Sequence, residues 1–179
     1  MAEYLWIFWS FSLLGWVLER LFAAVTRSPR RRRRCLLLLP LCPVYGLGMA
    51  AVLALPPSLR SGWPLYLWGG LTATSVEYIY HWWGETFLGV SFWDYTGVFG
   101  NLRGRVCLPF SLAWGLLLFP AVYLVTPPVV ALADRVPVGV TWWLLLAFTA
   151  DAVCSLRFLA VTHDLEALRA VIWPVSADR

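Results

Sequence analysis

The sequence contains no lysine: all 14 basic residues among its 179 residues are arginines. A Walker A loop uses a lysine to reach the nucleotide phosphates, and a Schiff-base mechanism needs a lysine amine, so both are excluded. The four cysteines form no C-x-x-C pair, and the two histidines, His81 and His163, are too few for an ordinary zinc framework. We therefore expect no cofactor, no bound metal and no ATP hydrolysis within this chain.

Charged residues are also scarce. They make up 13% of the chain, whereas 60% of its residues are hydrophobic and the mean hydropathy is +0.71. A soluble domain is closer to ~45–50% apolar and about 25% charged. The composition excludes a soluble enzyme, a disordered tail and a free-standing nucleic-acid binder, and it indicates an integral membrane protein.

Five apolar stretches are long enough to be predicted as membrane spans, since a transmembrane helix needs roughly 20 apolar residues. The predicted fold class is all-α: a polytopic membrane helix bundle that forms a single integral membrane domain over residues 1–179. A short further helix at 165–173 is expected to lie on the membrane surface, because Glu166 and Arg169 interrupt its apolar residues. The spans are predicted at about 4–25, 35–55, 63–87, 106–125 and 138–161.

The distribution of arginines predicts the orientation. Arg27 and the run 30–34 follow the first span, so the positive-inside rule puts the first loop in the cytoplasm and the N-terminus outside. With five spans the C-terminus is then inside, and ten of the 14 arginines fall on the inside. Because these basic residues follow the first apolar stretch, we interpret it as a retained helix and not as a signal peptide. Such a run also attracts anionic membrane lipid, so no nucleic-acid partner is expected.

The third predicted span carries three ionisable residues, Glu77, His81 and Glu85, spaced four apart. Each step of four rotates only ~40° around a helix, so they lie along one face, with about 12 Å between the outer two. An ionised group in the bilayer costs ~2.5–3.5 kcal/mol on insertion scales. The row is therefore either a pathway or cation site, or a structural row of polar groups satisfied by Arg or Tyr from neighbouring helices.

Two more carboxylates lie within predicted spans. Glu19 is near the cytoplasmic end of the first span, where it is either part of a site or an interfacial ion pair. Asp151 is in the middle of the fifth span. We expect it to pair with Arg157, two turns later, or with a residue on another helix.

The second predicted span is interrupted by Pro40 and Pro43, which remove backbone donors, and it continues with Tyr45, Gly46 and Gly48. Broken helices of this kind line binding sites in transporters. The alternative is a packing kink at which the glycines allow helices to approach closely.

The third loop, 89–105, combines aromatic residues and glycines with four polar residues: Asp94, Asn101, Arg103 and Arg105. This mixture suits a membrane interface, so we expect an interfacial or re-entrant loop. It could act as a gate or as a docking surface for a cytoplasmic partner. Asp94 is expected to pair with Arg103 or Arg105 inside the loop.

Several motifs between about residues 6 and 119 carry a resemblance to a known family. Their residues are Gly15, Trp16, Glu19, Pro40, Cys42, Pro43, Tyr45, Gly46, Val76, Glu77, Tyr78, Glu85, Trp93, Asp94, Tyr95, Asn101, Gly104, Arg105, Val106, Cys107, Leu108, Ser111, Leu112, Trp114 and Gly115. In this order and at these spacings, the chain resembles a bacterial family of small multi-span membrane proteins catalogued as type IV ABC-transporter permeases. The resemblance implies a permease-like protein of the bacterial cytoplasmic (inner) membrane, a separate cytoplasmic ATPase docking at 89–105, and a homo-oligomer.

Three functions are compatible with these patterns. The first is a transport subunit that binds a small solute or ion along a pathway formed by Glu19, Tyr45, Glu77, His81 and Glu85. The second is a non-transport scaffold or sensor that acts through its cytoplasmic loop. The third is an intramembrane enzyme with Glu77, His81 or Glu85 as acid–base groups, which no nucleophile–base motif supports; we expect the protein not to be an enzyme.

Overall fold

The computed structural model describes residues 2–26 and 35–170, and the regular elements within these ranges are helices and helical turns. It contains no strand there, only an isolated bridge between Leu102 and Val106, which confirms the all-α class. The elements are α1 (Ala2–Thr26), α2 (Pro43–Leu53), the 3-10 turn η2 (Pro57–Leu59), α3 (Gly62–Pro64), the π-helical turn η3 (Leu65–Gly69), α4 (Gly70–Trp83), the π-helical turn η4 (Gly84–Leu88), α5 (Leu108–Pro120), the π-helical turn η5 (Ala121–Val125), α6 (Thr126–Ala133), α7 (Val138–Thr162) and α8 (Leu165–Ala170).

Three described helices are long and apolar enough to cross a membrane: Ala2–Thr26, Leu108–Ala133 and Val138–Thr162. They correspond to the predicted spans 4–25, 106–125 and 138–161. The predicted count of five spans is not confirmed. The arginines at 27 and 30–34, on which the predicted orientation depends, lie outside the described residues.

The predicted span 35–55 is not one helix. Only α2 is helical there, and its 11 residues rise about 16 Å, well short of a hydrocarbon core of ~30 Å. The residues before it, 35–42, are irregular. The reason lies in the prolines: Pro40 removes a donor within the irregular segment, and Pro43 occupies the first turn of α2, where a missing N–H costs nothing.

The predicted helix at 63–87 is present. The elements α3, η3, α4 and η4 follow one another without a break over 62–88, roughly 40 Å at 1.5 Å per residue. This helix is nonetheless absent from the three that qualify as spans by length and composition. Its polar face, with Glu77, His81 and Glu85, lowers its hydropathy. We refer to it below as the 62–88 helix.

The predicted end of the fourth span at about residue 125 is wrong, since the helix continues past Pro127 and Pro128 to Ala133. The π-helical turn η5 follows Pro120 and absorbs the disturbance that the prolines cause. The Thr126 hydroxyl donates a hydrogen bond to the Ala121 carbonyl oxygen over 2.8 Å, and so occupies an acceptor near the prolines, which have no N–H to offer.

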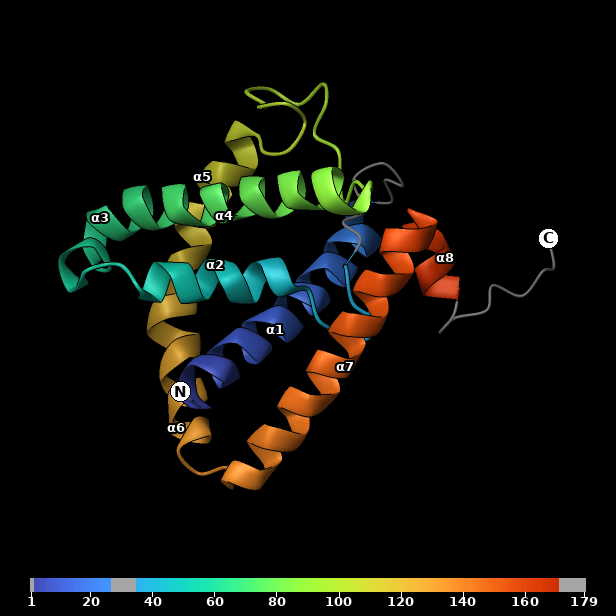
Figure 1. The fold of residues 1–179 in the computed structure, drawn as a ribbon. Helices are drawn as coiled ribbons and strands as arrows, with labels where there is room; N and C mark the ends of the chain where they lie inside the picture. Colours follow the sequence, from blue (N-terminus) through green and yellow to red (C-terminus); the bar gives the residue numbers. More distant parts are fainter. Residues whose placement is uncertain (1, 27–34, 171–179) are drawn as a thin grey trace.

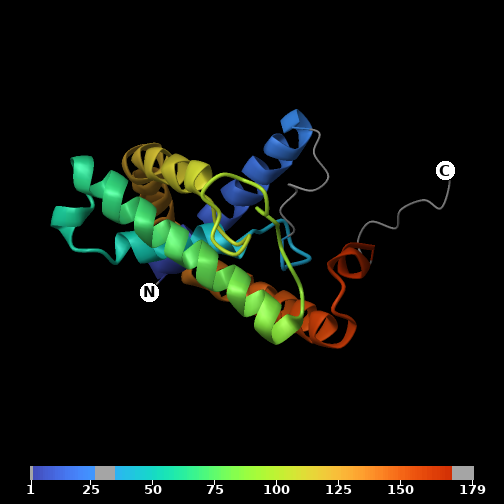
Figure 2. The same cartoon turned by 90° about the horizontal axis from the view of Figure 1, so that it is seen from above.

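Helix α2 lies between α1 and the 62–88 helix, and runs beside the latter (Figure 1). Helix α1 also contacts α6 and α7, while α5 packs on α4. The loop between η4 and α5 projects beyond the helices at the top of Figure 1, and Figure 2 shows it beside α4, at the N-terminal end of α5. Glycines permit the closest crossing: a Cβ at Gly46 would lie 2.4 Å from the Phe8 carbonyl oxygen, so α1 and α2 could not approach this closely with a larger residue.

Candidate functional site

The irregular segment 35–42 is held by a carboxylate of α7. The backbone N–H groups of Leu38 and Leu39 donate to Asp151 Oδ1 and Oδ2 over 3.1 and 2.9 Å, and the Ser155 hydroxyl donates to Oδ1 over 3.0 Å. The expected pairing with Arg157 is wrong: no ion pair joins these two described residues. Asp151 instead satisfies backbone donors that a helix would have satisfied internally, as a low-dielectric environment requires.

Glu77 of α4 is buried, with 1% of its surface exposed. The Tyr95 hydroxyl donates to its Oε1 over 3.2 Å, and the Trp114 indole N–H donates to its Oε2 over 2.7 Å. Tyr95 comes from the loop after η4 and Trp114 from α5, so three separate parts of the chain fix this carboxylate. An indole N–H only donates, which makes Glu77 the acceptor.

A second carboxylate, that of Glu19, bonds an aromatic residue that contacts Trp114. The Tyr45 hydroxyl of α2 donates to Glu19 Oε1 of α1 over 2.5 Å. The rings of Tyr45 and Trp114 meet edge to face, with centroids 5.0 Å apart. Glu19 and Glu77 are thus linked through Tyr45 and Trp114.

Two adjoining cavities flank this aromatic pair. The Glu77 cavity has a volume of about 200 Å³, and the Glu19 cavity about 210 Å³. Both are lined by Leu18, Tyr45, Trp114 and Leu117. The Glu77 cavity is also lined by Phe11, Leu14, Gly15, Val44, Gly48, Met49, Ala73, Leu118, Pro120, Ala121 and Val125, and the Glu19 cavity by Phe22, Tyr95, Phe110 and Ala113.

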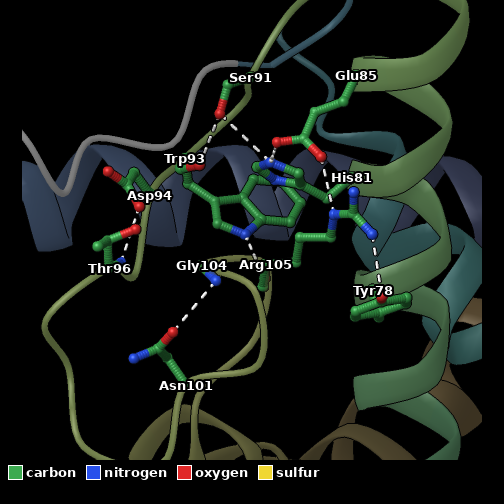
Figure 3. A network of polar contacts seen from close by, with 10 residues as sticks. All are labelled: Tyr78, His81, Glu85, Ser91, Trp93, Asp94, Thr96, Asn101, Gly104 and Arg105. Carbon is green, nitrogen blue, oxygen red and sulfur yellow. Dashed lines mark hydrogen bonds and ion pairs between the residues drawn. The ribbon is translucent and has the colours of Figure 1, made fainter.

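Glu85 belongs to a different group of contacts (Figure 3). Arg105 Nε donates to Glu85 Oε2 over 2.7 Å, and Arg105 Nη1 donates to the Tyr78 hydroxyl over 2.9 Å. His81 Nε2 lies 3.1 Å from Glu85 Oε1 and 3.3 Å from the Ser91 hydroxyl. An arginine from the loop therefore neutralises the Glu85 carboxylate. For Glu85 this contact agrees with the second alternative, a structural row of polar groups satisfied by neighbouring residues.

Arg105 remains charged in this position. Burial acts to lower its pKa, but the hydrogen bonds to Glu85 and Tyr78 and the charge of Glu85 act in the opposite direction, and the net effect raises the pKa above its ordinary value. Its guanidinium carbon also lies 5.1 Å from the centre of the Tyr78 ring, within range of a cation–π interaction. Arg105 thus fastens the loop to the 62–88 helix.

The remaining polar residues of the loop shape its backbone. The Thr96 N–H donates to Asp94 Oδ1 over 2.7 Å, and the Gly104 N–H donates to Asn101 Oδ1 over 3.2 Å. Arg103 has a positive φ of 54°, as a tight turn requires. The expected pairing of Asp94 with Arg103 or Arg105 is wrong, since no ion pair joins these three described residues.

The sequence-predicted residues thus divide into groups. Glu19, Tyr45 and Glu77 come together around the two cavities. His81 and Glu85 come together with Arg105 outside them, while Pro40, Pro43 and Gly46 shape α2 and the segment before it.

The sequence prediction did not assign Trp114, Tyr95 or Phe11 to the site. The order of motifs around 93–95 and 114–115 pointed to the first two, without indicating a contact with Glu77. In the part of the chain that the structure describes, no group of three or more His, Cys, Asp or Glu residues could hold a metal ion.

A family model described as "Putative ABC-transporter type IV" matches residues 6–156. The match runs from α1 into α7 and so includes both cavities, the loop and Asp151. It extends past residue 119, where the resemblance read from the motifs ended. No curated protein and no solved structure matches the chain.

Proposed function

The chain belongs to this type IV ABC-transporter family, and from that premise we propose that it is a permease-like membrane subunit that binds and moves a small solute or ion. The observation that carries the proposal is the placement of Glu77 and Glu19. They come from different helices and face adjoining cavities that share Tyr45 and Trp114. A carboxylate among membrane helices marks a substrate or ion pathway by default.

Movement between the cavities would pass Tyr45 and Trp114. These rings form the shared wall, and each also bonds a carboxylate: Tyr45 bonds Glu19, and Trp114 bonds Glu77. A rotation of Tyr45 would break its bond to Glu19 and open the wall. In this proposal Tyr45 is the gate, and the two carboxylates are successive binding positions.

The energy source in this proposal is a separate ATPase. The chain has no lysine for a Walker A loop, so a cytoplasmic partner would supply hydrolysis. We propose the loop 89–107 as its docking surface, since Arg105 fastens the loop to the helix that carries Glu77. We also propose the bacterial cytoplasmic membrane as the location, with the N-terminus outside. We propose a homo-oligomer as well, because the three candidate spans found among residues 2–26 and 35–170 are few for a transporter.

A scaffold or sensor function is the second candidate. Its support is that Phe99 and Leu102 in the loop are 77% and 57% exposed, as a surface for a protein partner would be. This function needs no solute in the cavities, so it predicts that Glu77 can be neutralised without loss.

The test compares the solute and ion content of cells that lack the gene with cells that carry it. Any compound whose distribution changes in the deletion strain is then followed in strains expressing the wild type, Glu77→Gln or Glu166→Gln at equal membrane levels. Glu166 is an exposed carboxylate on α8 and serves as the matched control. We expect the wild type and Glu166→Gln to restore the distribution and Glu77→Gln to fail. Full restoration by Glu77→Gln would contradict transport and favour the scaffold function.

A further inference from the structure

We infer that the Glu77 cavity takes a small organic monocation, such as a protonated amine or a quaternary ammonium group. The inference rests on the proposed function and names the class of its solute. It follows from three properties of the cavity: its charge, its aromatic lining and its fixed geometry.

The charge of the lining has one sign. Among the described residues that line this cavity, Glu77 is the only one with a carboxyl group, and none is basic. A carboxylate in an apolar enclosure attracts a cation and repels an anion. The cavity is therefore unsuited to phosphate, sulfate or a carboxylate solute.

The lining side chains offer few oxygen atoms to a hard divalent ion. Calcium takes six to eight oxygen ligands, and magnesium demands a near-octahedral set. Besides the Glu77 carboxylate, the lining side chains offer one oxygen, the Tyr45 hydroxyl, which already bonds Glu19. A single carboxylate within an otherwise apolar wall matches one positive charge on a body that is itself apolar.

Aromatic rings supply the second attraction. Phe11, Tyr45 and Trp114 all line the cavity, and the latter two rings meet at an interplanar angle of 66°, so they form a corner. Aromatic rings attract organic cations electrostatically, and cages of such rings recognise quaternary ammonium groups. The corner lies beside the carboxylate, because Trp114 itself donates to Glu77.

The carboxylate is also held in place before any solute arrives. Tyr95 and Trp114 donate to separate oxygens of Glu77, which fixes the plane of the group. A fixed group loses little freedom on binding, so its attraction is retained in the affinity. The remaining volume of about 200 Å³ suits a solute of only a few heavy atoms.

The test measures binding to the purified full-length protein in lipid nanodiscs by titration calorimetry. The probes are choline and protonated ethanolamine, each compared with an uncharged molecule of the same shape, 3,3-dimethyl-1-butanol and 1-propanol. We expect at least one cation to bind the wild type about tenfold or more tightly than its neutral counterpart, a difference of about 1.4 kcal/mol. Glu77→Gln should reduce this preference severalfold, to the part that the aromatic rings supply, and Glu166→Gln should retain it in full.

The wild-type comparison decides the matter even if Glu77→Gln fails to fold. Equal affinity for cation and neutral counterpart, or binding of neither, overturns the inference, as does a charge preference that Glu77→Gln leaves unchanged. If the preference is absent but Glu77→Gln still fails to restore solute distribution in cells, the transport proposal stands and the solute belongs to another class. If Glu77→Gln restores that distribution, the proposed function itself fails.

Discussion

Glu77 and Glu85 lie on the same helix, two turns apart, yet they differ in burial and in the partners of their carboxylates. Glu77 is 1% exposed, accepts hydrogen bonds from neutral groups and faces a cavity. The side chain of Glu85 is 35% exposed and forms an ion pair with Arg105, which the loop supplies. The same residue type at the same helical spacing therefore serves two purposes, and its partners separate them.

Asp151 extends the comparison to α7. Like Glu85, it fastens an irregular segment to a helix, here through the N–H groups of Leu38 and Leu39. Carboxylates with backbone or cationic partners hold the non-helical parts of this protein in place. The carboxylates beside Tyr45 and Trp114, Glu77 and Glu19, each line a cavity. We therefore expect changes to the first kind to reduce stability, and changes to the second kind to impair the proposed solute binding.

The largest expected effect on stability comes from Asp151→Ala. The change leaves two backbone N–H groups without an acceptor in a partly buried setting. A fully buried group of this kind costs about 1–3 kcal/mol, and because water reaches Leu39 we expect a total loss of about 2–4 kcal/mol. Asp151→Asn retains one acceptor oxygen and should lose roughly half as much. Thermal unfolding of the purified protein in one detergent checks both variants. An unchanged unfolding temperature in Asp151→Ala would remove Asp151 from the structural group.

A smaller effect is expected from Arg105→Ala, because water reaches the Glu85 carboxylate and partly replaces its partner. We expect a modest fall in the unfolding temperature together with faster proteolysis within 89–107. Adding Glu85→Gln to Arg105→Ala should cost little more, since the pair is already broken. Additive losses in the double variant would contradict a direct interaction between the two residues.

The same pair gives a pH prediction. Because the pKa of Arg105 is raised on folding, its contribution is fully present below the ordinary arginine pKa and is lost only above the raised value. The protection of the loop from proteolysis should therefore not decline between neutral pH and about pH 10, because this whole interval lies below the ordinary pKa of arginine. A decline over that interval in the wild type that is absent in Arg105→Ala would contradict this assignment.

Local patterns in the sequence were sufficient for several features. Continuous apolar runs predicted α1 and α7, because a helix in lipid satisfies its own backbone. The spacing of four between His81 and Glu85 predicted that they share a face, and they lie 3.1 Å apart. The prolines 40 and 43 predicted an interruption within 35–55, either a broken helix or a packing kink, although not that the whole segment before α2 would be irregular.

Features that depend on distant partners could not be predicted in this way. Segment 35–42 is held by Asp151, more than 100 residues away, and no local pattern pairs them. The continuation of the helix beyond Pro128 depends on a π-helical turn, which proline position alone does not reveal. Likewise, the sequence marked both Glu77 and Glu85 as candidates, but only the positions of Trp114 and Arg105 show which one faces a cavity.

The smallest expected effect on stability is that of Glu77→Gln, and it is the sharpest test of the comparison. The glutamine amide oxygen can still accept from the Trp114 N–H, and the amide N–H₂ can donate to the Tyr95 hydroxyl, which accepts as well as donates. With both contacts retained, we expect a change below about 1 kcal/mol. Thermal unfolding beside Asp151→Ala in the same detergent measures it. A loss as large as that of Asp151→Ala would place Glu77 among the structural carboxylates. A small loss together with failed solute exchange would separate its role in transport from its role in the fold, because the charge would then be dispensable for folding and required for function.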